Sequence, residues 1–146
     1  MPEIYTFTKE ILKKYIDAII RDTSDFEYNN WKEENFLLDL PDKWEFSIAL
    51  FDGSSITGFS INSRKSDVFY MHFFYILKKY RKSKAGEGLL NACENKAAEN
   101  KLQIVRLKCN KNNFAALNFY LKNGYAINKT DLHDSNLYLL EKKLNQ

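Results

Sequence analysis

Hydrophobic positions in the first third of the chain recur with the period of a helix. In residues 9–22, apolar side chains follow one another every three or four positions, which predicts an amphipathic helix with one buried face. A second helix is predicted at residues 29–40, and it ends before Pro41 because the residue before a proline avoids helical dihedral angles. A short strand at residues 3–8 precedes both helices.

The middle of the chain changes to the pattern of strands. Residues 44–51 and 55–63 are joined by the sequence Asp-Gly-Ser-Ser, which is a good turn for a β-hairpin. Residues 67–77 are apolar almost throughout, as is typical of a central strand that is covered on both faces. This stretch is also too short to span a membrane. We therefore predict three neighbouring strands.

The last third of the chain alternates between the two patterns. Its predicted elements are a helix from about residue 85, a strand at 103–109, a helix at 113–123, and strands at 124–127 and 135–144. No repeat, low-complexity block or linker separates them from the earlier elements. The order β-α-α-β-β-β-α-β-α-β-β predicts an α/β fold with a mixed sheet, in a single domain that spans residues 1–146.

Composition supports a globular domain and narrows its ligands. Of 146 residues, 45% are hydrophobic and 15% aromatic, which is enough for a core and argues against disorder. The 22 basic residues nearly match the 19 acidic ones, so the net charge of +3 suits a small anionic ligand better than nucleic acid. Cys93 and Cys109 have no partner at metal-ligand spacing, so no metal is expected. Two reduced thiols and an amino terminus without a signal-peptide pattern predict a cytoplasmic protein.

A cluster of basic residues lies directly before the predicted helix at residue 85. Arg81, Lys82 and Lys84 precede two glycines, Gly86 and Gly88. This arrangement suggests an anion at the amino terminus of the helix, where backbone N–H groups and the helix dipole favour negative charge. The P-loop sequence is absent. A dinucleotide fingerprint would need a third glycine three residues after Gly88, where asparagine stands.

The segment from Arg81 to Gly86 resembles a third phosphate-binding sequence, the pyrophosphate loop Arg/Gln-x-x-Gly-x-Gly/Ala of the GNAT N-acetyltransferases, which use acetyl-coenzyme A (acetyl-CoA). Gly86 has no side chain and lets the main chain approach a phosphate closely. Lys84 stands where the family has its first glycine, and lysine resists a positive φ, although its ammonium can contact a phosphate. The resemblance assigns seven loop residues to acetyl-CoA binding: Arg81, Lys82, Ser83, Lys84, Ala85, Gly86 and Glu87.

A second segment, "NFAALNFYLKNGY", resembles the downstream signature Asn-x-x-Ala-x-x-x-Tyr-x-x-x-Gly-aromatic of the same family. Asn113, Ala116 and Tyr120 are three or four positions apart and therefore share one face of a helix. In the family, the asparagine lies along the pantetheine arm, the alanine leaves room for it, and the tyrosine lies near the sulfur. The two signatures occur in the family's order, with a predicted strand between them.

Residues 71–81 resemble the family's fourth strand running into this loop, with Ile76 five residues before Arg81. The resemblance implies that the strand splays from its neighbour, and that free N–H groups at Ile76 and Leu77 bind the thioester carbonyl as an oxyanion hole. It covers about the last two thirds of the chain well. It further implies a mixed, mostly antiparallel sheet flanked by about four helices, N-acetyltransferase activity, and a homodimer paired through the C-terminal strands.

Acetyl transfer to an amine needs a group that takes the amine's proton and a group that protonates the leaving thiolate. Tyr120 is the predicted acid, because a tyrosine with a pKa of about 10 can donate to a thiolate. His72 is the candidate base, four residues before Ile76 and on the same side of a regular strand. A core histidine bonded to a backbone carbonyl would give the same sequence. Alternative bases are a water chain, Glu33, Glu34 and Asp67.

The acceptor is left open among a polyamine, an aminoglycoside, a peptide amino terminus, a lysine and an amino sugar. Residues 21–35, which would frame it in the family, carry five acids beside Tyr28 and Trp31. This composition suits a cationic amine through charge and cation–π contact, and it equally suits a solvated helix face. Two alternatives remain: a GNAT fold that binds acyl-CoA without turnover or uses a longer acyl group, and a small nucleic-acid-binding module whose phosphate patch is the basic segment 78–84.

Overall fold

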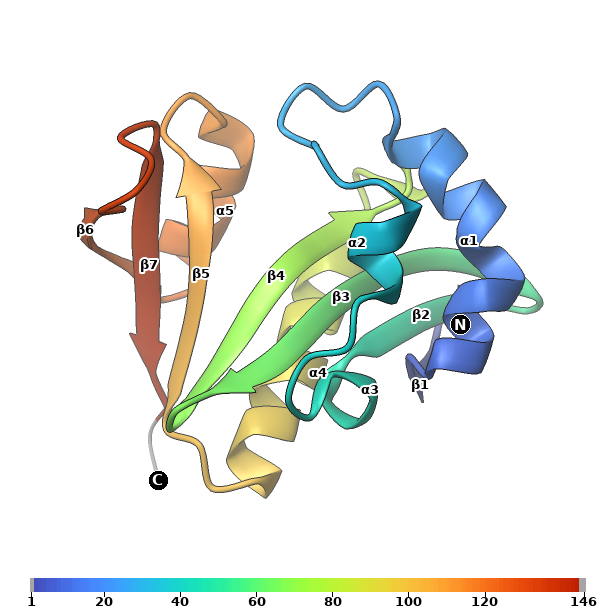
Figure 1. Ribbon diagram of the computed structural model, residues 1–146, viewed down its shortest axis with the longest axis horizontal. Helices are drawn as coiled ribbons and strands as arrows, with labels where there is room; N and C mark the ends of the chain where they lie inside the picture. The colour runs from blue at the N-terminus through green and yellow to red at the C-terminus, as the bar shows by residue number, and fades with distance from the viewer. Residues whose placement is uncertain (1, 145–146) are drawn as a thin grey trace.

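The computed structural model describes residues 2–144 as a seven-stranded sheet with helices on both faces (Figure 1). From edge to edge the strand order is β1-β2-β3-β4-β5-β7-β6, and among these residues only the β4–β5 pair is parallel. The predicted α/β fold with a mixed, mostly antiparallel sheet is therefore confirmed.

The strands are β1 (Glu3–Thr6), β2 (Ile48–Asp52), β3 (Ser55–Lys65), β4 (Val68–Ile76), β5 (Ile104–Asn110), β6 (Ala126–Thr130) and β7 (Leu137–Lys143). The helices are α1 (Lys9–Thr23), α2 (Glu33–Leu37), α3 (Lys43–Phe46), α4 (Ala85–Glu99) and α5 (Phe114–Lys122), with a 3-10 turn at Lys78–Tyr80.

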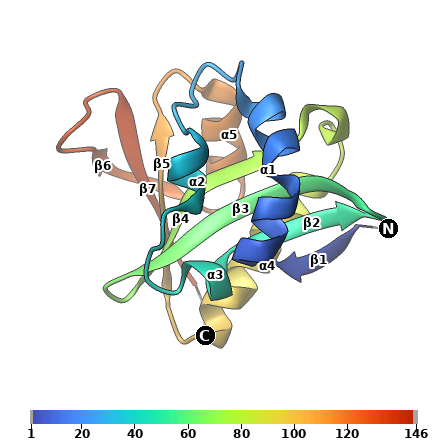
Figure 2. The ribbon, with the colours of Figure 1, turned by 45° about the vertical axis from the view of Figure 1, so that its right-hand side comes forward.

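The two faces of the sheet carry two separate hydrophobic clusters. On one face, α1 lies across β2 and β3 (Figure 2) and packs there through Leu12, Ile16 and Ile19. On the other face, α4 packs through Leu89 and Cys93, and α5 joins the same cluster. Burying apolar surface on both faces is what the nearly continuous apolar pattern of the central strands requires. The sheet is thus enclosed between an N-terminal and a C-terminal layer.

A β-bulge in β4 changes which side chains face which layer. Met71 pairs with Asn62 and Phe73 pairs with Ile61, so His72 is an extra residue without an opposite number on β3. Before the bulge, Met71 packs with the α4 cluster; after it, Phe73 packs with the α1 cluster. A regular strand would have kept both odd-numbered residues on one face. One inserted residue therefore reverses the faces of the second half of β4.

Two of the predicted elements are wrong in detail. The strand predicted at 44–51 begins only at Ile48, because residues 43–46 form the short helix α3. This helix is fixed from outside the segment: the buried Lys43 side chain donates to the carbonyls of Phe36 and Leu38, at 2.7 and 2.5 Å. Burial lowers the pKa of Lys43 to about 8. These bonds reach carbonyls five and seven residues earlier in the chain, and they leave no trace in the hydrophobic pattern that predicted the strand.

The helix predicted at residues 29–40 is also shorter, since α2 covers only Glu33–Leu37. Asn29 explains the difference. Its side-chain oxygen accepts a hydrogen bond from the N–H of Trp31 at 2.8 Å, and its amide donates to the carbonyl of Thr23 at 2.9 Å. Asparagine competes in this way with helical backbone bonding. Residues 24–32 consequently form a loop between α1 and α2, called the α1–α2 loop below.

Candidate active site

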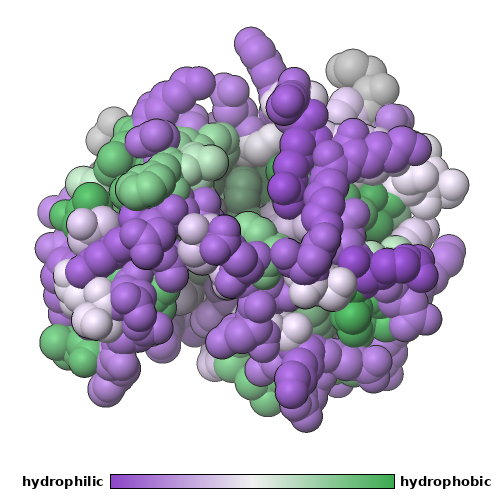
Figure 3. Space-filling view, turned by 90° about the horizontal axis from the view of Figure 1, so that it is seen from above, coloured by the Kyte–Doolittle hydropathy of each residue, from purple (hydrophilic) through white to green (hydrophobic). Residues whose placement is uncertain are grey.

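A cleft opens where β4 and β5 part. The two strands pair only from Val68 to Met71 on β4 and from Ile104 to Leu107 on β5, and the ribbon shows them diverging beyond these residues (Figure 1). The cleft has a volume of about 680 Å³, and its lining comes from both strands, from α4 and α5, and from the α1–α2 loop. Seen from above, hydrophobic surface lies deep in this hollow between hydrophilic side chains (Figure 3). A concave, largely apolar site of this size is typical of a ligand-binding cleft.

The backbone of Ile76 faces this cleft. Leu77 donates its N–H to the carbonyl of Thr57 on β3, at 2.9 Å. Because peptide groups alternate in direction along a strand, the N–H and C=O of Ile76 point the other way, toward the gap left by β5. Of the two predicted oxyanion donors, only Ile76 is placed to offer its N–H, since that of Leu77 is already used.

Arg81 does not reach freely into solvent. Its Nε donates to the carbonyl of Ile76 at 2.9 Å, and its guanidinium lies 5.0 Å from the centre of the Tyr75 ring. Both contacts fix the end of β4. The arginine of the predicted pyrophosphate loop thus braces the strand that precedes the loop.

The turn before α4 is organised by Ser83. Its hydroxyl donates to the carbonyl of Tyr80 at 2.9 Å and accepts from the N–H of Ala85 at 3.2 Å. The left-handed residue of the turn is Lys82, with φ of 63°, whereas Lys84 has φ of −89° as the N-cap of α4. The position at which the family has its first glycine therefore needs no positive φ here, and a lysine is tolerated without backbone strain.

The first turn of α4 presents unpaired amides toward the cleft. The first helical bond runs from the N–H of Gly88 to the carbonyl of Lys84, so the amides of Gly86 and Glu87 have no carbonyl partner within the helix. Gly86 and Glu87 line the cleft. A Cβ added at Gly86 would meet only the Phe119 ring, at 3.4 Å. These groups can receive a phosphate, with the helix dipole favouring its charge.

The helix α5 brings the second signature to the opposite wall. Asn113 is its N-cap and accepts a hydrogen bond from the N–H of Ala116 at 3.3 Å, which leaves the asparagine amide group as a donor. Asn113, Ala116 and Tyr120 all line the cleft. The structure thus brings residues of both sequence signatures to one cavity.

Tyr120 is buried, with 6% of its surface exposed, and packs against Phe74 and Tyr125. Its hydroxyl forms no hydrogen bond within residues 2–144, and the residue lines the cleft, so the O–H can turn toward a ligand. Burial raises the pKa of Tyr120 well above its ordinary value. At neutral pH the side chain is therefore a protonated donor.

His72 also lines the cleft. Its Nε2 is 2.6 Å from the hydroxyl oxygen of Ser63, and burial lowers its pKa to about 4. The prediction that it shares a side of β4 with Ile76 is wrong, because of the bulge: Ile76 packs with the α4 cluster, whereas His72 lies beside Tyr70 and Ser63. The imidazole is neutral at pH 7, and a pKa near 4 suits a general base poorly.

Aromatic and amide side chains of the α1–α2 loop form a further wall of the cleft, called the acceptor wall below because the sequence predicts the acceptor there. The α1–α2 loop contributes Phe26, Tyr28, Asn29, Asn30 and Trp31 to the cleft lining. None of the five acids of residues 21–35 lines it, so the expectation of an acidic pocket for a cationic amine is not met by the placement of these side chains. Tyr28 also donates to the carbonyl of Asn112 at 3.1 Å, which joins this loop to the turn before α5 across the cleft.

Sequence reasoning missed several cleft residues. Lys108 and Cys109 line the cleft at the end of β5, and Tyr75 lines it on β4. The ammonium of Lys108 is paired with Asp131 at 3.1 Å, and burial raises the pKa of the Cys109 thiol to about 11. For Lys108 and Cys109 the available signal was their position at the end of the predicted strand that precedes the second signature.

The alternative bases lie elsewhere. Glu33 and Glu34 are exposed in the first turn of α2, and Asp67 is exposed in the turn between β3 and β4; none of the three lines the cleft.

Within residues 2–144, no three His, Cys, Asp or Glu side chains form a group that could hold a metal ion. No helix in this part of the chain is long and apolar enough to cross a membrane.

Comparison with known proteins agrees with this geometry. The sequence model of the acetyltransferase (GNAT) family matches residues 14–125, which is most of the chain, and the protein belongs to that family. No curated protein sequence matches the chain significantly.

Solved structures share the fold over almost the whole chain. Ard1 from Thermoplasma volcanium has a TM-score of 0.85 at 22% identity, with 99% of each chain covered. PaiA N-acetyltransferase from Thermoplasma acidophilum, in complex with coenzyme A, has a TM-score of 0.77 at 19% identity, covering 98% of this chain and 99% of its own. Naa50 from Arabidopsis thaliana, in complex with the bisubstrate analogue CoA-Ac-MVNAL, has a TM-score of 0.76 at 16% identity, with the same coverage. Identities this low establish the common fold.

Proposed function

We propose that this acetyltransferase uses acetyl-CoA to acetylate a primary amine. The observation that carries the proposal is the parting of β4 and β5, which places the Ile76 peptide group, the first turn of α4 and Tyr120 around one cleft. The amides of Gly86 and Glu87 would receive the pyrophosphate, together with the ammonium groups of the loop lysines. The remaining lining of Asn113 and Ala116 would border the pantetheine arm.

The chemistry follows from these positions. The N–H of Ile76 would donate to the thioester carbonyl oxygen and stabilise the negative charge that develops on it as the amine nitrogen attacks. A new C–N bond forms, and the C–S bond breaks. Tyr120 would give its proton to the departing sulfur and recover one from solvent. The amine's own proton would pass to water or to a base, for which His72 stays a prediction.

The acceptor proposed for the first test is a peptide amino terminus. The structure of Arabidopsis Naa50 contains a bisubstrate analogue that ends in the peptide MVNAL, and this chain shares its fold from end to end. The wall of Phe26, Tyr28 and Trp31 offers apolar contact and no carboxylate, which favours an amine on a neutral or apolar molecule over a polycation. Cytoplasmic location and a homodimer stay predictions from the sequence.

Thermal unfolding with added ligands tests the proposal. Acetyl-CoA at about a hundred times its dissociation constant should stabilise the fold by about 2.7 kcal/mol, seen as a rise of several degrees in Tm. Acetylation is then measured as thiol release with the peptide MVNAL, spermidine, an aminoglycoside and phenethylamine. The absence of any shift at millimolar acetyl-CoA would contradict the proposal. A shift with nucleic acid alone would revive the phosphate-patch alternative, which the family match does not support.

A further inference from the structure

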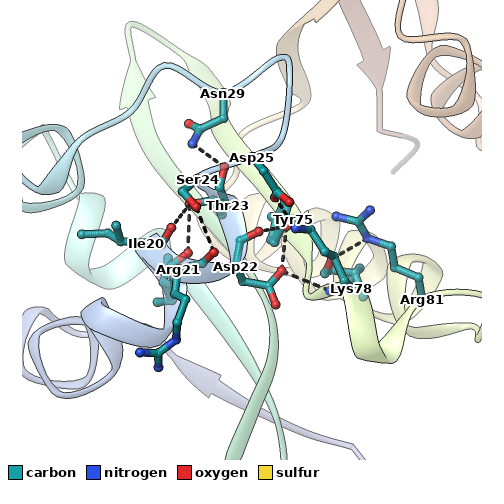
Figure 4. A network of polar contacts seen from close by, with 12 residues as sticks. Ile20, Arg21, Asp22, Thr23, Ser24, Asp25, Asn29, Tyr75, Lys78 and Arg81 are labelled. Carbon is teal, nitrogen blue, oxygen red and sulfur yellow. Dashed lines mark hydrogen bonds and ion pairs between the residues drawn. The ribbon is translucent and has the colours of Figure 1, made fainter.

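Asp22 lies at the C-terminal end of α1, where a carboxylate destabilises the helix because it faces the negative end of the helix dipole. Its position therefore calls for contacts outside the helix, and Figure 4 shows them. The single O–H of Tyr75 is shared between two acceptors, Asp22 Oδ1 at 2.7 Å and the Asp22 carbonyl at 2.9 Å. The backbone N–H of Lys78 donates to the same Oδ1 at 3.1 Å.

These three bonds grip the residues on both sides of Ile76. Tyr75 precedes Ile76 in β4, and Lys78 begins the turn that leads to the phosphate loop. In this stretch β4 has a neighbour only on the β3 side, because its pairing with β5 ends at Met71. A half-supported strand end needs other restraints if its peptide groups are to keep one direction. Asp22 supplies such restraints from the end of α1, and Arg81 supplies another through its hydrogen bond to the Ile76 carbonyl.

Tyr75, which the carboxylate restrains, also contacts the α1–α2 loop. The α1–α2 loop begins two residues after Asp22, and its Phe26 ring lies 5.8 Å from the Tyr75 ring. The loop and the end of β4 are far apart in sequence, and the Asp22–Tyr75 hydrogen bond spans 53 residues. Asp22 would thus influence both the Ile76 N–H that contacts the thioester carbonyl and the position of the acceptor wall.

We propose that Asp22 is a positioning residue for acetyl transfer: it holds the end of β4 so that the Ile76 N–H is aimed at the thioester carbonyl. This inference rests on the proposed function. It predicts a property that needs no acceptor. Acetyl-CoA has the carbonyl that coenzyme A lacks, so a well-aimed N–H should make acetyl-CoA bind about threefold to tenfold more tightly.

The test measures dissociation constants of acetyl-CoA and of coenzyme A, with the Tm, for the protein and four variants. In Asp22→Ala both bonds to the carboxylate are lost and only the backbone carbonyl still accepts from Tyr75, so the preference for acetyl-CoA should be largely lost, while the affinity for coenzyme A itself changes by less than about twofold. Tyr75→Phe, which removes one donor and leaves the Lys78 bond, should lose part of the preference. Asp22→Asn keeps an acceptor oxygen in place and should retain most of it.

Asp25→Ala is the matched control. Asp25 is an exposed carboxylate three residues away that pairs with the Lys78 side chain and touches neither Tyr75 nor the Lys78 N–H. Its removal should leave both affinities unchanged. A purely structural Asp22 would lower the Tm of the Asp22→Ala variant and leave the preference at the wild-type value.

Each result decides the matter. A folded Asp22→Ala variant with an intact preference, or one that loses affinity for both ligands equally, overturns the inference. If Asp22→Ala does not fold, Tyr75→Phe carries the decision, and an unchanged preference there overturns it. Wild-type protein that binds both ligands equally refutes the aimed Ile76 contact while leaving acetyl-CoA binding intact. Wild-type protein that binds neither ligand refutes the proposed function itself.

Discussion

The two walls of the cleft are built by different means. The wall that we propose binds acetyl-CoA, called the acetyl-CoA wall below, consists of the first turn of α4 and one face of α5. Asn113 caps α5, and Ser83 accepts a hydrogen bond from the N–H of Ala85 at the start of α4. The acceptor wall is an irregular loop that keeps its shape through contacts with distant residues, such as the Tyr28 bond to Asn112 and the Asp22 bonds to β4. The first wall is fixed by contacts between residues close in sequence, and the second by contacts between residues far apart in sequence.

This difference indicates how each wall can change. A wall set by helix caps and glycines changes only if those few residues change, which suits the constant ligand that we propose for it, acetyl-CoA. A loop held by a handful of long-range hydrogen bonds can exchange its side chains while its anchors remain. We therefore expect variants of the first wall to alter acetyl-CoA binding or chemistry, and variants of the second to alter acceptor use.

The largest expected effect is on chemistry at the α5 wall. Tyr120→Phe keeps the ring and its packing and removes the proton donor, so turnover should fall by roughly 10²–10⁴. Acetyl-CoA binding and Tm should change little. The measurement is the rate of thiol release with the best acceptor from the panel. An unaltered rate would remove Tyr120 from the mechanism and leave solvent as the proton source.

The next largest effect is the dependence of folding stability on pH that His72 should cause. The pKa of His72 is about 4 in the fold against 6.5 for an ordinary histidine, so the unfolded chain binds more protons between these values. The free energy of unfolding is therefore unaffected by His72 protonation above pH 6.5. It falls as pH drops toward 4, by up to about 3 kcal/mol, because the unfolded chain gains the proton first. Chemical unfolding of the wild type and of His72→Gln between pH 4 and 7 measures it.

In His72→Gln this acid-sensitive part of the stability should be absent. Equal pH dependence in both proteins would show that His72 titrates normally. The same variant tests the base. If His72 takes the amine's proton, the variant loses the acidic limb of the pH–rate profile, and higher pH partly restores its rate by supplying free amine. A profile of unchanged shape would assign His72 a structural role.

Gly86→Val tests the α4 wall directly. The added side chain would stand between the first-turn amides and a phosphate, and inside the protein it would meet only the Phe119 ring. The fold should persist, and the stabilisation of about 2.7 kcal/mol by saturating acetyl-CoA should vanish. Gly88→Ala is the matched control, because nothing lies within 4 Å of a Cβ at that position. A full Tm shift in Gly86→Val would mean that the phosphate binds elsewhere.

Asn29→Ala sharpens the contrast from the other wall. It removes both side-chain bonds that shape the α1–α2 loop and should cost about 1–2 kcal/mol of stability. The KM for the acceptor should rise severalfold while the affinity for acetyl-CoA stays the same. Glu27→Ala, an exposed change in the same loop, should do neither. An equal loss of acetyl-CoA affinity in Asn29→Ala would contradict the separation of the two walls.

The smallest effect is expected at Lys84. If its ammonium contacts a phosphate, Lys84→Ala should weaken acetyl-CoA binding by roughly 0.5–1.5 kcal/mol, and less at high salt. If the lysine is merely tolerated, Lys84→Gly should bind more tightly than the wild type. Titration of the two variants at low and high salt distinguishes these results by their opposite sign.

The acetyl-CoA wall was the part that the sequence could predict. Glycines, caps and helical spacing act within a few residues, so both signatures and the central strand β4 were found where they lie. The break at Lys43 and the loop shaped by Asn29 depend on side-chain hydrogen bonds to backbone groups two to seven residues away, which the hydrophobic pattern does not record. The bulge at His72 has no signal in that pattern either, and it reversed the predicted side of that residue. Prediction failed where polar contacts or a bulge, rather than hydrophobic periodicity, decided the structure.

The bulge at His72 gives β4 one residue to spare in length. Deleting His72 would leave Met71 followed directly by Phe73, so the two would alternate as in a regular strand, with the pairing to β3 unchanged. Phe74 and Ile76 would still face α4, and the peptide group of Ile76 would still point to the cleft. One residue inserted between Phe74 and Ile76 would instead turn Ile76 over and point its peptide group to β3. A single-codon deletion at the bulge should therefore keep both cores and the cleft, whereas a single-codon insertion beyond it should lose the cleft.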